Sequence, residues 1–307
     1  MRPGLLALLA AAAAAAVSTD VISQVRSAIA QKNFAAAEAA IKDYRSRDGV
    51  TPELAEAVSW MGRGTLAEKN YDAAERYAAE ARGLALQLLK SRPLDSEKHL
   101  PIALGAAIEV HAHVLAFRGQ LSEAIQFLNG ELNSYRETSI RTRIQKNIHL
   151  LSLEGKSAPP LDVKHWVGPK APPPLEKLRG RPVLLFFWAH WCGDCKEQVP
   201  ILAKIQKVYG PRGLVILAPT QLYGYAAQGE EAAPRQETAY IEQVRRRYYS
   251  DIAGVAAPLS QENFKIYGAS TTPTLVVLDR QGAVRFYHPG NAPYETLAAR
   301  IDAALKR

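Results

Sequence analysis

The feature that most constrains this chain is a pair of cysteines separated by two residues. Cys192 and Cys195 are the only cysteines among 307 residues, and they lie in the segment FFWAHWCGDCKEQVP directly after the apolar run VLLFFWA. The apolar run is typical of a buried β-strand. The spacing of apolar residues after it predicts a helix from Cys192 to about Tyr209. Three uses of the pair remain open at this point: a static structural disulfide, half of a metal site, and a disulfide that forms and breaks during a reaction.

The expected position of Cys192 favours the third use. At the start of a helix, unpaired backbone N–H groups and the helix dipole favour negative charge. A cysteine at such a position has its thiol pKa lowered from about 8.5 to roughly 3.5–7.5, and the thiolate is the form that attacks a disulfide. We therefore predict that Cys192 is the nucleophile and that Cys195, one helical turn later, resolves the mixed disulfide.

Two segments together carry a resemblance to a known family. RGRPVLLFFWAHWCGDCKEQVP and the later TTPTLVVLDRQGAV resemble the thioredoxin fold, and more narrowly the exported TlpA/ResA-like thiol-disulfide oxidoreductases, over about residues 160–307. The resemblance implies protein thiols and disulfides as substrates, an upstream redox partner, and neither a metal nor another cofactor. It also implies a cis peptide bond between Thr272 and Pro273, facing the cysteines, with Trp191, Thr272 and Pro273 in contact with the bound polypeptide.

Several residues around the cysteines depart from the family pattern. Thioredoxins carry a buried aspartate in the strand before the motif, where this chain has Phe186, and many TlpA/ResA-like proteins have a glutamate where it has Gln198. Gly193 and Asp194 stand between the cysteines, where strongly oxidising relatives often have a histidine. A carboxylate at that place disfavours the thiolate, so we expect a reductant. His190 either tunes Cys192 by its charge or is simply exposed beside the site.

Three other functions fit the sequence less well. Two cysteines at this spacing also suit zinc, but four ligands are wanted and the remaining candidates are scattered histidines. A peroxiredoxin-like thiol peroxidase shares the fold, yet that chemistry generally needs a threonine near the attacking cysteine, where this chain has Ala189, His190 and Trp191. A partner-binding scaffold with a non-catalytic thioredoxin-like domain also remains open.

The N-terminal half reads as a separate helical domain over residues 19–153. It is rich in alanine, leucine and glutamate with helix-period apolar spacing, and NFAAAEAAI, NYDAAERYA and QLSEAIQFL resemble one another. Phe34, Tyr71 and Leu121 each have an alanine three residues later, which lets paired helices approach closely. The pattern predicts about three hairpins of a degenerate tetratricopeptide-like array, with an ordinary bundle as the alternative. Stacked hairpins present a groove for a possible protein partner.

Residues 154–307 read as an α/β domain that begins with a proline-rich connector, 154–182. Proline interrupts helices, so this connector marks the boundary, and Leu161 to Val167 are expected to form an edge strand. Apolar runs then alternate with helical patterns. A polar insertion at 221–240 is either a lip over the active site, with Tyr223 and Tyr225 as contacts, or a surface loop.

Residues 1–18 resemble a secretory signal peptide, because one early positive charge precedes an apolar stretch from Leu5 to Val17 and then small residues. The expected location is outside the cytoplasm, in the bacterial periplasm. We expect no membrane-spanning segment after the signal is removed. The formal charge of +8 does not indicate a nucleic-acid-binding module. The basic run from Arg245 to Arg247 lies among acidic residues, which is typical of a solvated helix face.

Overall fold

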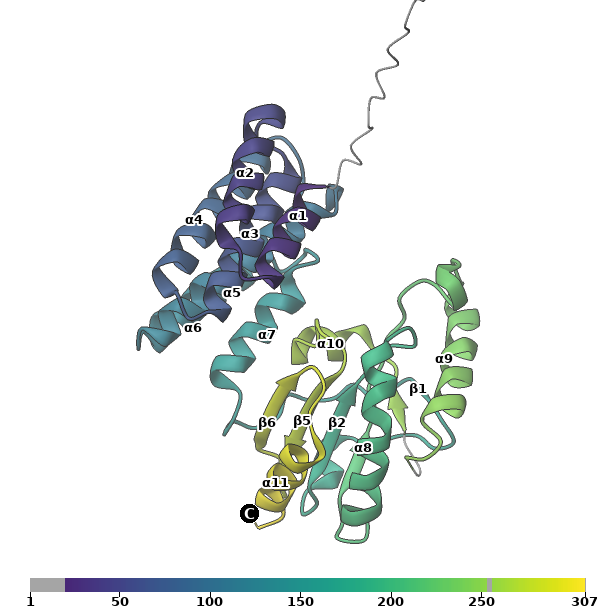
Figure 1. Ribbon diagram of the computed structural model, residues 1–307. Coiled ribbons are helices and arrows are strands. Elements are labelled where there is room, and N and C mark those ends of the chain that lie inside the picture. The colour runs from purple at the N-terminus through teal and green to yellow at the C-terminus, as the bar shows by residue number, and fades with distance from the viewer. Residues whose placement is uncertain (1–19, 253–255, 307) are drawn as a thin grey trace, which may run out of the picture.

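The computed structural model describes residues 20–252 and 256–306 (Figure 1). The expected signal peptide, residues 1–18, lies outside these residues. The first part of the described chain is all helical, as predicted. Its elements are α1 (Val21–Ala30), α2 (Phe34–Asp48), α3 (Pro52–Ala67), α4 (Tyr71–Leu88), the short 3-10 helix η1 (Leu94–Ser96), α5 (His99–Phe117), α6 (Leu121–Ser134) and α7 (Arg141–Ser152).

The three segments that resemble one another in the sequence share one structural position. Phe34, Tyr71 and Leu121 are the first residues of α2, α4 and α6, and the alanines three residues later are buried. Each of these helices follows a tight turn whose residue before the helix cap has a positive φ. The turns are Lys32–Asn33, Lys69–Asn70 and Gly119–Gln120, with φ of 56°, 60° and 82° at their first residues. The helical region therefore contains three hairpins with one kind of turn, while its likeness to a tetratricopeptide array remains a prediction.

Helix α5 differs from one expectation. With 19 residues and a mean hydropathy of 1.6, it is long and apolar enough to cross a membrane by length and composition alone. The sequence reading expected no such segment. In the structure this helix packs against α3, α4, α6 and α7, and Leu100, Leu104 and Ile108 are fully buried. Its apolar character is that of a central core helix.

The second part of the described chain is α/β, as predicted. Strands β3, β2, β5 and β6 form a four-stranded sheet in that order, with β2 parallel to β3 and antiparallel to β5. The elements are β1 (Trp166–Val167), η2 (Leu175–Leu178), β2 (Val183–Phe187), α8 (Gly193–Tyr209), β3 (Val215–Leu217), η3 (Ala227–Gly229), α9 (Pro234–Tyr248), β4 (Ala257–Pro258), α10 (Gln261–Tyr267), β5 (Thr274–Leu278), β6 (Val284–Pro289) and α11 (Tyr294–Leu305).

The edge strand expected at Leu161 to Val167 is shorter than predicted. Only Trp166 and Val167 form β1, which pairs antiparallel with β4. Single bridges, Leu217 to Ala256 and Thr220 to Leu259, connect β4 to the chain at and after the end of β3. The pair β1–β4 thereby extends the main sheet on its β3 side.

Alternating residues of the buried strand β2 face two hydrophobic cores. Leu184 and Phe186 pack with apolar residues of α8, α9 and α11. Leu185 and Phe187 face the other side, where the core includes residues of α10 and of the proline-rich connector. The domain therefore has helices on both faces of its sheet, with α8 and α11 visible in front of it in Figure 1.

Helix α7 joins the helical region to the α/β region. It packs against α5 and α6 on one side and against α10 and β6 on the other (Figure 1). His149 lies in this junction, within 2.7 Å of the carbonyl oxygen of Ile266 and edge-on to Tyr287. Gly268, at φ 62°, lies so close to α7 that a side chain there would overlap the backbone of Lys146. The two regions are thus in direct contact.

Candidate active site

The cysteine pair lies at the N-terminal end of α8, where the sequence predicted it. Strand β2 ends at Phe187, and Cys192 is the residue that caps α8. Its Sγ accepts the backbone N–H of Cys195 at 3.0 Å. The two cysteines form a disulfide with their Cα atoms 5.3 Å apart. Cys195 is fully buried and Cys192 is 3% exposed, so the residue that the sequence predicts as nucleophile is the more accessible of two buried cysteines.

The residues around the pair differ in exposure. Trp191 is 50% exposed, and Gly193 and Asp194 are also at the surface. The Trp191 ring meets the Tyr223 ring edge-on, with centroids 5.5 Å apart. Contact of Trp191 with a bound polypeptide remains a prediction.

The Thr272–Pro273 peptide bond is cis, the geometry implied by the family resemblance. Pro273 is buried and Thr272 is partly exposed, directly before β5. The carbonyl oxygen of Pro273 accepts the N–H of Gly290 at 2.7 Å. Contact of Thr272 and Pro273 with a bound polypeptide remains a prediction.

Gln198 has a structural role that the sequence reading missed. Its side chain is buried on α8 and bonds both backbone groups of Ala292. The Nε2 atom donates to the carbonyl oxygen at 3.0 Å, and the Oε1 atom accepts the N–H at 2.9 Å. It thereby holds the loop before α11 against the helix that carries the cysteines. Phe186, where thioredoxins have the buried aspartate, packs in the same core as Cys195. Neither position supplies a carboxylate.

The alternative that His190 is exposed beside the site is wrong. His190 is 1% exposed, and its Nε2 lies 3.2 Å from a carboxylate oxygen of Glu237, which is equally buried. The rings of Tyr223, Tyr225 and Tyr240 surround it edge-on, with centroids 5.3 to 5.5 Å away. Tertiary packing decides this burial, because the partners come from a segment 33 to 50 residues further along the chain.

Burial lowers the pKa of His190, and the hydrogen bond to Glu237 opposes that shift only in part. At neutral pH the ring is therefore the neutral imidazole, which donates its Nε2–H to the carboxylate. A neutral ring offers no positive charge to stabilise the Cys192 thiolate. This observation disfavours the tuning of Cys192 by the charge of His190 that the sequence left open.

Glu237 was not singled out from the sequence. Its carboxylate accepts the backbone N–H groups of Tyr223 at 2.6 Å and Gly224 at 2.9 Å, in addition to the bond from His190. No local sequence signal marks this residue, since its partners lie 13, 14 and 47 residues away. It connects the insertion at 221–240 to the loop that carries the cysteines.

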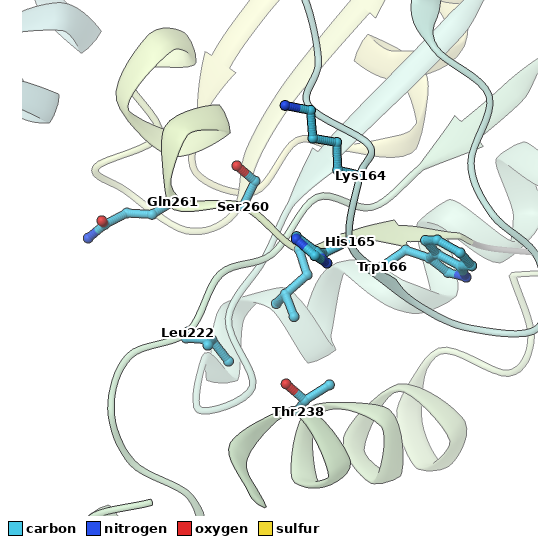
Figure 2. Close-up of a pocket in the computed structure, with 8 residues that line it drawn as sticks. Lys164, His165, Trp166, Leu222, Thr238, Ser260 and Gln261 are labelled. Atoms are coloured by element: carbon cyan, nitrogen blue, oxygen red, sulfur yellow. The ribbon is translucent and has the colours of Figure 1, made fainter. Parts of the chain in front are cut away.

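A pocket of about 610 Å³ lies beside this cluster, between the β1 segment, α9 and the start of α10. Figure 2 shows Thr238 of α9 pointing toward the segment that carries His165 and Trp166. The lining residues are Lys164, His165, Trp166, Leu222, Thr238, Leu259, Ser260 and Gln261. Leu222 and Thr238 are the sequence neighbours of Tyr223 and Glu237, so the same insertion forms a wall of the pocket and encloses His190.

Comparison with known proteins finds related sequences for the second part of the chain. Residues 176–305 match the family described as thioredoxin-like domain. The chain is 28% identical over 152 residues to the thioredoxin-like protein YneN of Bacillus subtilis, across 48% of this chain and 79% of YneN. It is 27% identical over 130 residues to the thiol-disulfide oxidoreductase ResA of Bacillus thuringiensis, across 42% of this chain and 66% of ResA.

Among solved structures, the chain is similar to a thiol-disulfide isomerase from Corynebacterium glutamicum, with 17% identity and a TM-score of 0.41 over 50% of this chain and 97% of that one. The descriptions of the family and of the curated relatives fit the strand-to-helix position of the cysteines and the disulfide between them. The chain is therefore a thiol-disulfide oxidoreductase, and its residues 176–305 match the family described as thioredoxin-like domain.

Proposed function

We propose that the protein is exported and reduces disulfide bonds in protein substrates, with Cys192 as the nucleophile and Cys195 as the resolving thiol. The observation that carries the proposal is the position of Cys192 Sγ at the N-terminus of α8, where it accepts the N–H of Cys195. In the reduced protein the same N–H and the dipole of a 17-residue helix stabilise a thiolate at this sulfur.

The reaction transfers two electrons in two exchange steps. The Cys192 thiolate attacks one sulfur of the substrate disulfide, forms a mixed disulfide, and releases the other substrate sulfur as a thiolate. The Cys195 thiolate then attacks Cys192 Sγ, which forms the Cys192–Cys195 disulfide and releases the second substrate sulfur. Both released thiolates take up protons, so the substrate is reduced and the protein is oxidised. An upstream dithiol partner restores the reduced protein.

The surroundings of the pair support a reductant. Asp194 lies beside Cys192 in the first turn of α8, and its carboxylate disfavours the thiolate. The neutral, buried His190 supplies no compensating positive charge. We expect a reduction potential nearer that of thioredoxin, about −270 mV, than the value of about −120 mV found for a strong oxidant. A measured potential above about −180 mV contradicts this assignment.

Export rests on the signal-like residues 1–18, and the periplasm is the proposed destination. The proposed role of the helical region is to dock a protein partner or to position the redox domain, since α7 lies directly against α10 and β6. A tetratricopeptide-like groove between the hairpins is the surface we propose for such a partner.

An insulin-reduction assay with dithiothreitol as electron source tests the function. Cys192→Ser and Cys195→Ser each remove turnover if the pair is catalytic, and Cys195→Ser accumulates a mixed disulfide that a reductant releases. If the protein is a scaffold with a non-catalytic domain, the unaltered protein and both variants should give the same slow background rate of insulin reduction. Recovery of partners trapped by the Cys195→Ser protein in its own cell compartment identifies the substrates and tests export at the same time.

A further inference from the structure

The buried pair His190 and Glu237, which we call the latch, joins the loop that carries the cysteines to the insertion at 221–240. His190 directly precedes Trp191 in the loop that carries the cysteines. Glu237 lies in the first turn of α9, at the end of the insertion. Its two oxygens accept three N–H groups: one from His190 and the backbone groups of Tyr223 and Gly224. These bonds suit an ionised carboxylate, which only accepts.

Losing any one of these hydrogen-bond partners would cost free energy, because it would leave a buried polar group unpaired. A buried carboxylate is strongly disfavoured unless hydrogen bonds replace the water it has lost. Hydrogen bonds to a charged group contribute more than neutral ones, and a buried donor left unpaired is costly. The latch thus holds three segments together: the start of the insertion, the first turn of α9 and the loop that carries the cysteines. The insertion is not a freely moving surface loop at Tyr223 and Gly224.

The latch places aromatic side chains next to the cysteines. Tyr223, whose backbone N–H bonds Glu237, meets the ring of Trp191 edge-on, and Tyr225 lies 6.3 Å from Tyr223 between ring centroids. Trp191 is half exposed and Tyr225 is partly exposed. Aromatic residues of this kind are enriched where polypeptides bind. The result is a group of partly exposed aromatic side chains beside Cys192.

We propose that His190 and Glu237 are positioning residues that hold Tyr223 against Trp191, and that this aromatic surface selects polypeptide disulfides flanked by apolar or aromatic residues. The inference rests on the proposed function for its substrate class. A small disulfide reaches Cys192 without needing the surface, whereas a polypeptide has to lie across it. The latch therefore acts on substrate binding and leaves the chemistry of the cysteines unchanged.

Two substitutions separate the hydrogen bonds from the packing. Glu237→Gln keeps the shape but replaces one acceptor oxygen by an amide that donates, which opposes the N–H groups facing it. His190→Phe keeps an aromatic ring among the tyrosines and removes the N–H donor. The matched control is Glu242→Gln on the same helix, because Glu242 pairs with Arg245 and Arg246 away from the site.

Amide hydrogen exchange tests the latch without an activity assay. In the Glu237→Gln protein, the Tyr223 and Gly224 amides should exchange at least about tenfold faster, since each loses or weakens a charge-assisted bond. Exchange in α8 and β2 should stay unchanged, and Glu242→Gln should behave like the unaltered protein. Unchanged exchange at Tyr223 and Gly224 overturns the latch, and so does an equal acceleration throughout the domain.

Kinetics then test the role in selection. With insulin as substrate, Glu237→Gln and His190→Phe should raise KM about fivefold or more at nearly constant kcat, since an interaction of uniform binding is lost. With the small aliphatic disulfide bis(2-hydroxyethyl) disulfide, kcat/KM should change less than about twofold. The reduction potential of the cysteine pair should stay unchanged. An equal loss with both substrates, or none with insulin, overturns the proposal. Inactivity of the unaltered protein with both contradicts the proposed function instead, and the exchange rates alone then decide the latch.

Discussion

The helical region and the redox domain satisfy their buried polar side chains in different ways. In the helical region, charged side chains on neighbouring helices pair with each other, as Glu109 of α5 does with Arg143 and Lys146 of α7. In the redox domain, buried side chains bond mainly to backbone, as Gln198 does with Ala292. Even Glu237, which pairs with His190, takes two of its three bonds from backbone N–H groups.

The difference follows from the backbone. Helices satisfy their own interior N–H and C=O groups, so the polar contacts left between helices are between side chains. A sheet joined by loops leaves backbone groups in the connections, and nearby side chains must bond them. The stability of the helical region should therefore depend on pH through its ion pairs. The stability of the α/β region should depend instead on whether each buried polar side chain can reach the backbone groups that it bonds.

The largest effect is expected from Glu109→Ala. The change leaves Arg63, Arg143 and Lys146 without their shared carboxylate in a mostly buried space, and removing one member of such a group costs about 3–5 kcal/mol. Urea denaturation followed by far-ultraviolet circular dichroism measures the loss. The control Glu80→Ala removes an exposed pair with Arg45 and should cost less than about 1 kcal/mol.

The same carboxylate gives the helical region its acid sensitivity. Burial by itself raises the pKa of Glu109, but Arg143 and Lys146 together lower that pKa well below its ordinary value. The stabilisation is present above the unfolded pKa of about 4.3 and is lost as the pH falls toward the folded pKa. Stability of Glu109→Ala should fall less steeply with acid. Parallel pH profiles for the two proteins contradict this.

Gln198→Ala should give the next largest effect, about 2–3 kcal/mol, because the buried N–H and C=O of Ala292 lose their partner. Since no charge is involved, the loss should be the same at low and high salt, unlike that of Glu109→Ala. Gln206→Ala, on the same helix but partly exposed, is the control and should change stability by less than about 0.5 kcal/mol. A salt-dependent loss for Gln198→Ala breaks the distinction between the two regions.

His149→Phe tests the junction between the regions and should cost about 1 kcal/mol, the hydrogen bond to the Ile266 carbonyl. Burial lowers the pKa of His149, so the folded state favours the neutral ring. Its stabilisation is complete above the unfolded pKa of about 6.5 and declines as the pH falls through that value. The difference in the free energy of unfolding between pH 7 and pH 5, measured by chemical denaturation, should be smaller for His149→Phe than for the unaltered protein. His288→Phe, which changes a partly exposed ring, should keep the full difference.

Tyr249→Phe should have the smallest effect. The side chain is buried against Phe186 and Trp188, and its hydroxyl has no hydrogen-bond partner among the described residues. Removing an unbonded buried hydroxyl breaks no hydrogen bond and relieves the cost of burying it, so the free energy of unfolding should rise by less than about 1 kcal/mol. A thermal or urea transition that reveals a loss above about 1 kcal/mol shows that the hydroxyl is bonded, and then this position follows the rule seen at Gln198.

The sequence determined the features that depend on neighbouring residues. The apolar run before Cys192 gave a buried strand, and the helix after it begins at the cysteine pair. The similar segments at Phe34, Tyr71 and Leu121 all start the second helix of a hairpin. Periodicity and adjacency carry this information, because strands and helices repeat their side-chain directions at fixed intervals.

The tertiary structure alone decided which distant residues meet. His190 and Glu237 are 47 residues apart, Gln198 and Ala292 are 94 apart, and His149 bonds a carbonyl 117 residues away. No local pattern marks such partners, since each side chain is compatible by itself with an exposed position. The physical reason is burial. Once packing removes water from these groups, only the partner that the fold brings near can form their hydrogen bonds.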